Sequence, residues 1–338
     1  MLAAAGKRKV QCRIFRPFDE ALSFISLFFR FCIKSVLLVL HKTNQPAQRL
    51  AHCGQRKEIT MIIWELLKAF FLGIVEGITE WLPVSSTGHM LLVDEFIHLN
   101  MSDAFKNMFF ILIQLGAILA VVVIFWKKMF PFQFSDKKQP VIKKDIFSLW
   151  FKVVVACIPG AIVTLLFDDY IEAHLHTPVV IAAALILYGI AFIFIESWNK
   201  KRSPLVPQLK DITYKTALII GLFQVLSIIP GTSRSGATIV GALLIGVSRV
   251  AAAEFTFFLA VPVMFGLSFV KLWDFGFTAF SGAEIAVLLT GMVTAFFVSA
   301  IAIRFLMDYV KKHDFKVFGW YRIALGILVL IYFSVSAF

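Results

Sequence analysis

Residues 71–92 combine an apolar background with side chains that can perform chemistry. The stretch carries Glu76 and Glu80, followed by Ser86 and His89. Two carboxylates four residues apart share one face of a helix, and Ser86 and His89 are one helical turn apart. Hydroxyl, imidazole and carboxylate groups supply nucleophiles and general bases, and paired carboxylates are hard ligands for a divalent cation. The types and spacing therefore predict proton-transfer or nucleophilic chemistry.

The same stretch contains a break in its helix. Pro83 is expected to end the helix that carries the glutamates. Ser85, Ser86 and Thr87 follow, which are common N-cap residues, and Gly88 comes next. Free backbone N–H groups at a helix N-terminus bind anions, phosphate above all. We expect these four residues to bind phosphate, with simple helix capping as the alternative.

A second turn repeats this layout in the other half of the chain with the charge reversed. Residues 230–236 read PGTSRSG and place Arg234 between Ser233 and Ser235. The glycines allow a ligand to approach the backbone, and a guanidinium group can hold two phosphate oxygens at once. Ser233, Ser235 and Gly236 are further candidate ligand-binding residues.

Together the two turns predict a site for a multiply charged anion. Ionisable side chains at membrane depth are costly and usually face a cavity or a partner. This favours function over the structural alternatives, which are an interfacial pair for Glu76 and Glu80, a satisfied buried His89 and an interfacial Arg234. The chemistry indicated is phosphoryl hydrolysis on a lipid substrate, with the arginine as anion clamp. One diphosphate would touch both turns, so Ser86 and Arg234 are expected within roughly 10 Å of each other.

The composition is that of an integral membrane protein. Hydrophobic residues make up 59% of the chain and charged residues 16%, and there are 37 phenylalanines. The apolar runs are continuous rather than alternating, which favours helices over a barrel. The net charge of +12 is placed largely in short loops, which argues against nucleic-acid binding. The four cysteines have no paired spacing, so neither a disulfide framework nor a zinc site is expected.

The apolar runs predict how the chain crosses the bilayer. Two pairs of short apolar runs flank the turns and are predicted to be re-entrant, because each run is shorter than the ~20 residues that a span requires. These pairs are 62–80 with 85–99 and 214–229 with 235–247. The sequence thus predicts an all-α polytopic membrane protein with about six transmembrane helices plus two re-entrant helix pairs in an inverted repeat. The predicted spans are 105–126, 149–167, 178–198, 251–272, 285–306 and 319–338.

The distribution of Lys and Arg predicts the orientation. Loops 127–152, 199–216 and 304–322 hold 7, 5 and 5 basic residues, whereas loops 168–177 and 273–284 hold none. The basic loops are therefore expected in the cytoplasm. The two re-entrant pairs then enter from opposite faces and meet near the midplane, as in inverted-repeat transporters.

Residues 1–60 differ from the remainder of the chain in their charge composition. Residues 1–60 hold 11 of the 33 Lys and Arg but 3 of the 21 Asp and Glu. Two interpretations are open: a loosely ordered or interfacial extension, or a start codon assigned upstream of the true one, for which Met61 is suitable. The membrane domain is then 61–338, with 61–198 and 199–338 as its repeats.

The motifs resemble those of a known family. EGITEWLPVSSTGH at 76–89 and PGTSRSGATI at 230–239 closely resemble the two signatures of the bacterial undecaprenyl-diphosphate phosphatases, the bacitracin-resistance family. QLGAILAVVV at 114–123 and AAAEFTFFLAVP at 251–262 extend the likeness. It covers about 61–338, and both signature motifs are long, so the resemblance is specific.

The resemblance implies an activity and roles for the residues. The reaction is hydrolysis of undecaprenyl diphosphate to undecaprenyl phosphate and inorganic phosphate (EC 3.6.1.27), which recycles the lipid carrier for peptidoglycan synthesis and confers bacitracin resistance. Glu76 and Glu80 would be the acidic pair. Ser86 would be the nucleophile and His89 the base, or alternatively the nucleophile. Arg234 would clamp the diphosphate.

The resemblance also implies a cofactor and a location. The cofactor would be a divalent cation, Mg²⁺ or Ca²⁺, with Glu76 and Glu80 as its ligands. The protein would lie in the bacterial inner membrane, its site opening to the periplasmic face, and a homodimer is an expected assembly. The type-2 phosphatidic acid phosphatases are a poorer match, because no His or Asp follows Ser233 and Arg234 at the required place. A lipid transporter or flippase stays open as an added activity.

Overall fold

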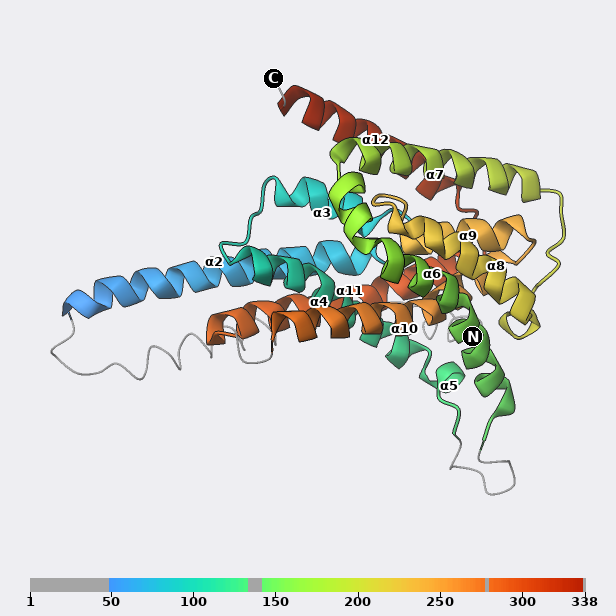
Figure 1. Cartoon of the computed structure of the whole chain (residues 1–338), viewed down its shortest axis with the longest axis horizontal. Helices are drawn as coiled ribbons and strands as arrows, with labels where there is room; N and C mark the ends of the chain where they lie inside the picture. Colours follow the sequence, from blue (N-terminus) through green and yellow to red (C-terminus); the bar gives the residue numbers. More distant parts are fainter. Residues whose placement is uncertain (1–48, 133–141, 277–279, 337–338) are drawn as a thin grey trace, which may run out of the picture. The chain divides into compact units, whose positions relative to one another are not determined.

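The computed structural model describes residues 49–132, 142–276 and 280–336, and every regular element in these ranges is a helix (Figure 1). The chain divides into two compact units, Met1–Glu65 and Leu66–Phe338. Both turns lie in the second unit. Of the predicted N-terminal extension, residues 1–48 lie outside the described residues, and 49–60 are the first part of a helix.

Six helices among the described residues are long and apolar enough to cross a membrane, which confirms the prediction of a polytopic helical protein. The chain is therefore a multi-pass membrane protein. These helices are α4 (Asp103–Ile124), α6 (Lys144–Leu175), α7 (Pro178–Asn199), α10 (Arg249–Phe275), α11 (Gly282–Val310) and α12 (Lys316–Ser336).

The remaining helices flank the two turns or connect the long ones. The first turn lies between α2 and α3, and the second follows α8 and precedes α9. Both α3 and α9 are too short to cross a bilayer, as expected. The bounds are α2 (Arg49–Thr79), α3 (Ser86–Asp94), α5 (Trp126–Met129), α8 (Tyr214–Val225) and α9 (Arg234–Leu244), with 3₁₀ turns at Leu209–Asp211 and Leu226–Ile228.

Two predicted loops are shorter than expected. Helix α6 continues to Leu175, so most of the predicted loop 168–177 is helical. Its residues include good helix formers, and the chain turns only where Thr177 caps α7. Most of the basic segment 304–322 is likewise helical, because α11 and α12 extend beyond the predicted spans 285–306 and 319–338, and Arg322 lies inside α12 as the second of these spans predicts.

Close packing of α12 along α7 positions one side of the site (Figure 1). The two helices approach at a pair of glycines. A Cβ atom on Gly189 would lie 2.7 Å from the Gly319 carbonyl oxygen, and one on Gly319 would lie 2.8 Å from that of Gly189. Small residues let membrane helices approach this closely. Helix α11 also packs along α4.

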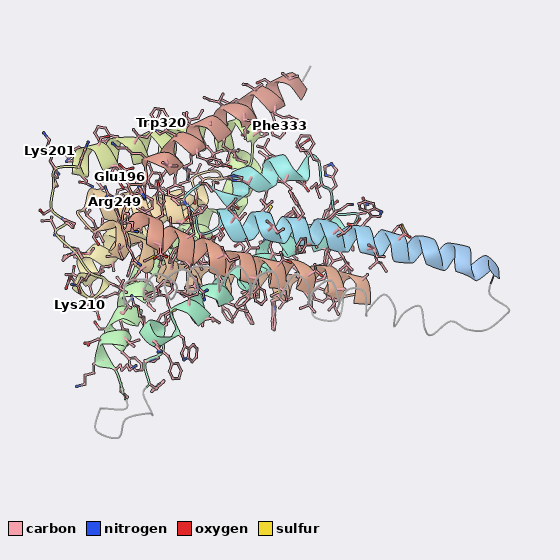
Figure 2. The ribbon with its side chains drawn as sticks, turned by 180° about the vertical axis from the view of Figure 1, so that it is seen from behind. Glu196, Lys201, Lys210, Arg249, Trp320 and Phe333 are labelled. Atoms are coloured by element: carbon pink, nitrogen blue, oxygen red, sulfur yellow. The ribbon has the colours of Figure 1, made fainter. Side chains whose placement is uncertain are left out.

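Two ion pairs connect other helices. Arg249 at the start of α10 binds Glu196 of α7 with 2.6 Å between Nη2 and Oε2, and Figure 2 labels both residues. The buried Glu196 carboxylate also accepts a hydrogen bond from the backbone N–H of Phe315. Lys128 binds Glu254 at 2.6 Å. These contacts give Arg249 and Glu254 a structural role in the packing of the helices.

Candidate active site

The two turns share one unusual backbone design. Ser85 caps α3 with φ 75° and Ser233 caps α9 with φ 67°, and they are the only non-glycine residues of the described chain with positive φ. Each hydroxyl accepts a hydrogen bond from a glycine three residues on, Gly88 N and Gly236 N respectively. Positive φ at a serine is strained, and residues held in strained backbone conformations cluster at functional sites.

Glu80 joins the two turns. Its Oε2 accepts a hydrogen bond from the Ser86 hydroxyl at 2.9 Å, and its Oε1 accepts one from Arg234 Nη2 at 3.0 Å. The Ser235 hydroxyl donates to the Glu80 backbone carbonyl at 3.3 Å. Since Ser86 and Arg234 bind the two oxygens of one carboxylate, they lie within roughly 10 Å of each other. The expected proximity of the two turns is confirmed.

Glu76 lies one helical turn before Glu80 and is only 2% exposed. Burial raises the pKa of Glu76 well above its usual value, and the charge and hydrogen bonding of Glu80 raise it further, while the charge of Arg234 lowers it. In the described part of the chain nothing donates a hydrogen bond to its Oε1. The two glutamates thus form the acidic pair expected from their spacing, and Glu76 favours the protonated form.

His89 has a defined tautomer. Its Nδ1 is 2.7 Å from the Ser85 carbonyl oxygen, which can only accept, so Nδ1 carries the proton. Its Nε2 is 2.7 Å from the hydroxyl of Tyr321, and the two rings are stacked. Burial lowers the pKa of His89, which favours the neutral ring. Nε2 is therefore the basic atom, and the Tyr321 hydroxyl donates to it.

Ser86 and His89 are engaged with different partners. Among the described residues, the Ser86 hydroxyl bonds to Glu80, and no hydrogen bond connects it with the His89 ring. Glu80 is therefore the group in contact with the Ser86 proton. The family resemblance implied this base function for His89 instead.

The other predicted ligand-binding residues have distinct surroundings. Thr87 is exposed at the start of α3. The Ser85 hydroxyl is buried and used for capping. Ser233 and Ser235 hydroxyls contact each other at 3.1 Å, and a Cβ on Gly236 would lie 2.8 Å from Arg322 Nη1. The start of α9 is thus closely packed, and Gly236 leaves the room that the Arg322 guanidinium group occupies.

Two residues at the site were missed by the sequence analysis. Tyr321 contacts His89, and Arg322 donates hydrogen bonds to backbone carbonyls of both turns. Both lie in the predicted span 319–338, and Arg322 was also counted among the basic residues of 304–322, but neither was assigned to the site. The available signal was Arg322, an ionisable residue inside a predicted span, because such residues usually face a cavity or a partner.

The acidic pair has the donor chemistry for a hard divalent cation. Glu76 Oε1 is a buried oxygen to which no described residue donates a hydrogen bond, and Glu80 lies beside it. No group of three or more His, Cys, Asp or Glu able to hold a metal occurs among the described residues. Mg²⁺ is commonly held by one or two carboxylates together with substrate phosphates. The residues fit a cation that is shared with a phosphate ligand.

The fold and the site define a polytopic membrane protein with an acidic pair and an arginine at two facing turns. Known proteins are similar to this chain in sequence. Residues 69–328 match the family described as bacitracin resistance protein BacA. An undecaprenyl-diphosphatase of Enterococcus faecalis is 73% identical over 267 residues, covering 79% of this chain and 96% of that protein. Proteins of the same name from Lachnoclostridium phytofermentans and Desulfitobacterium hafniense are 64% and 60% identical, covering 80% and 81% of this chain and 98% of each relative. The chain belongs to the BacA family.

Proposed function

We propose that this protein is a membrane-embedded undecaprenyl-diphosphatase that converts undecaprenyl diphosphate to undecaprenyl phosphate and inorganic phosphate. The observation that carries the proposal is the Glu80 carboxylate held between Ser86 and Arg234. The names of the close relatives and the match to the BacA family support the same activity and, with it, bacitracin resistance.

Substrate binding is proposed to rearrange the Arg234 ion pair. A diphosphate carries more negative charge than a single carboxylate and offers oxygens to both arms of a guanidinium group. Arg234 would therefore exchange Glu80 for the diphosphate. The N-termini of α3 and α9, whose caps are Ser85 and Ser233, add backbone N–H groups and the positive ends of two helix dipoles.

The exchange frees Glu80 to act as a base. The Ser86 hydroxyl already donates to Glu80 Oε2. In the first step the proton passes to Glu80, Ser86 Oγ forms a bond to the terminal phosphorus, and the bond from that phosphorus to the lipid phosphate oxygen breaks. In the second step water attacks the phosphorus of the phosphoserine, the bond from that phosphorus to Ser86 Oγ breaks, and neutral His89 takes a proton from the water through Nε2 and then releases it to solvent. Inorganic phosphate leaves and Ser86 is regenerated when Glu80 returns its proton.

Mg²⁺ or Ca²⁺ is proposed to be held by Glu76 and Glu80 together with phosphate oxygens. When bound, such a cation neutralises charge on the phosphates. Since burial disfavours the Glu76 carboxylate in the protein alone, cation and phosphate binding are expected to depend on each other.

The topology is proposed to be an inverted repeat of 61–198 and 199–338 with a re-entrant pair in each half. The matched serine caps of α3 and α9 support this proposal, as does the alternation of basic loops. It places the basic loops in the cytoplasm and the site opening toward the periplasm. Residues 1–60 would be an extension outside the phosphatase domain, and a homodimer stays a prediction.

Purified protein in detergent tests the activity. With undecaprenyl diphosphate and Mg²⁺ or Ca²⁺, we expect release of inorganic phosphate, loss of nearly all turnover in Ser86→Ala, and a phosphoserine that can be trapped in the parent. A protein that only transports lipid would release no inorganic phosphate in this assay, because transport requires a sealed membrane. Substantial turnover in Ser86→Ala together with its loss in His89→Ala would instead make the histidine the nucleophile or the base for water.

A further inference from the structure

Arg322 of α12 lies between the two turns and is 0% exposed. Its Nη2 donates hydrogen bonds to the backbone carbonyls of Gly231 and Thr232, each at 2.8 Å. Its Nη1 is 3.4 Å from the backbone carbonyl of Pro83, a longer contact. One guanidinium group therefore contacts the backbone of both turns, which are far apart in the sequence.

These carbonyls need a partner from outside their own segments. They belong to non-helical turns, where no helical N–H follows to bond them, and unpaired backbone groups are costly where water is excluded. The second turn is also packed tightly against α7, since a Cβ on Gly231 would lie 2.4 Å from the Ile181 carbonyl oxygen. A planar guanidinium group with five N–H donors can reach carbonyls on two segments, which a single ammonium group does less well.

The charge of Arg322 is not balanced by a carboxylate in the part of the chain that the structure describes. The side chain lies over the Tyr188 ring, 5.5 Å from its centroid. Its Nε has no hydrogen-bond partner among the described residues. A buried cation without a counter-ion is unfavourable, and a nearby anion relieves the cost. The same guanidinium group approaches the N-terminal turn of α9 at Gly236, where the diphosphate is proposed to bind.

We propose that Arg322 is a positioning residue of this site. It holds the Pro83 turn and the Gly231–Thr232 turn at the separation that allows Glu80 to bond Ser86 and Arg234 together, and its unbalanced charge favours a phosphate-bearing ligand between them. The inference rests on the proposed function for the reaction, whereas the spacing of the turns is measurable without it.

The test compares Arg322→Met and Arg322→Lys with a matched control, Arg304→Met, which removes an exposed arginine from α11. Hydrogen–deuterium exchange of residues 82–90 and 229–237 is measured together with kcat and KM for undecaprenyl diphosphate in detergent.

We expect Arg322→Met to exchange faster in both turns and to lose roughly a hundredfold or more in kcat, because the three hydrogen bonds from the guanidinium group to the Pro83, Gly231 and Thr232 carbonyls disappear. KM should rise because the charge that favours a phosphate ligand is lost, but by a smaller factor than kcat falls, since Arg234 still binds the diphosphate. Arg322→Lys should recover part of the activity and of the protection at 229–237, because an ammonium group can still bond the Gly231 and Thr232 carbonyls. Arg304→Met should match the parent.

Unchanged exchange in both turns of Arg322→Met would overturn the proposal, whether or not activity is lost. So would faster exchange accompanied by parent activity. If Arg322→Met is not recovered folded, Arg322→Lys decides: faster exchange at 82–90 with reduced kcat supports the proposal, and parent behaviour in both measurements contradicts it. If the parent releases no phosphate, the proposed function fails, while the exchange comparison still tests Arg322.

Discussion

Glu80 is the side chain that connects the two turns of the site. Its carboxylate oxygens bind Ser86 and Arg234, so the arginine is held in place before any ligand arrives. Substrate phosphates and Glu80 have the same sign of charge and compete for the guanidinium group. We therefore propose that the ion pair links anion binding to the release of a base, so that Ser86 is activated only when substrate is present.

Glu80→Gln tests this link. Glutamine has nearly the same shape, but it cannot take the Ser86 proton and it leaves Arg234 without its counter-charge. We expect kcat for phosphate release to fall roughly 10²- to 10⁴-fold, the range of a lost general base, with diphosphate binding retained. Glu284→Gln is the control, because a glutamine can keep the capping contact of Glu284 at the start of α11. Parent turnover in Glu80→Gln would contradict the base assignment.

The contact between His89 and Tyr321 predicts a pH effect. In the proposed mechanism neutral His89 is the active form, and it is lost as pH falls through its pKa. Burial lowers the pKa of His89, so the acid limb of kcat is expected below the usual histidine range. The Tyr321 hydroxyl donates to Nε2 and stabilises the neutral ring, so Tyr321→Phe should raise the pKa and move the acid limb to higher pH. Tyr332→Phe, on the same helix, should leave it in place; an unmoved limb in Tyr321→Phe would exclude His89 as its source.

At the scale of helices, the glycine crossing of α7 and α12 determines where the α12 side chains reach the turns. Ala in place of Gly189 would bring its Cβ within 2.7 Å of the Gly319 carbonyl oxygen, so the helices must separate. We expect Gly189→Ala to lower both the Tm in detergent and kcat, because Tyr321 and Arg322 move with α12. Gly266→Ala on α10 meets no atom within 4 Å and should be neutral or slightly stabilising. Equal effects of the two substitutions would contradict this account of the crossing.

The turns themselves were predictable because their local sequence specifies them. Proline ends a helix, serine caps the next one and glycine follows, so α3 and α9 begin where the motifs place them. The participation of α12 was not predictable, because Tyr321 and Arg322 reach the site through packing against α7. In the sequence, Arg322 was counted among the basic residues that set the membrane orientation. The end of α6 was missed because a polar, acidic run continued the helix beyond its apolar part.

At the scale of the whole molecule, the basic loops predict one orientation. A cysteine at Leu205, 82% exposed beside three basic residues at 200–202, should react only with reagents that reach the cytoplasm. A cysteine at exposed His176, between α6 and α7, should react with impermeant reagents from outside. Both are introduced after the four native cysteines are removed. Labelling of the two positions from the same side would contradict the proposed topology and the periplasmic opening.

The central claim is that one diphosphate is bound by both turns and takes Arg234 from Glu80. An experimental structure with a non-hydrolysable methylene diphosphonate analogue of the polyprenyl substrate tests it most directly. We expect Arg234 to contact phosphonate oxygens, Glu80 to keep its hydrogen bond with Ser86, and Ser86 Oγ to face the terminal phosphorus. A structure with the diphosphonate bound away from one of the turns, and with Arg234 still paired to Glu80, would contradict it.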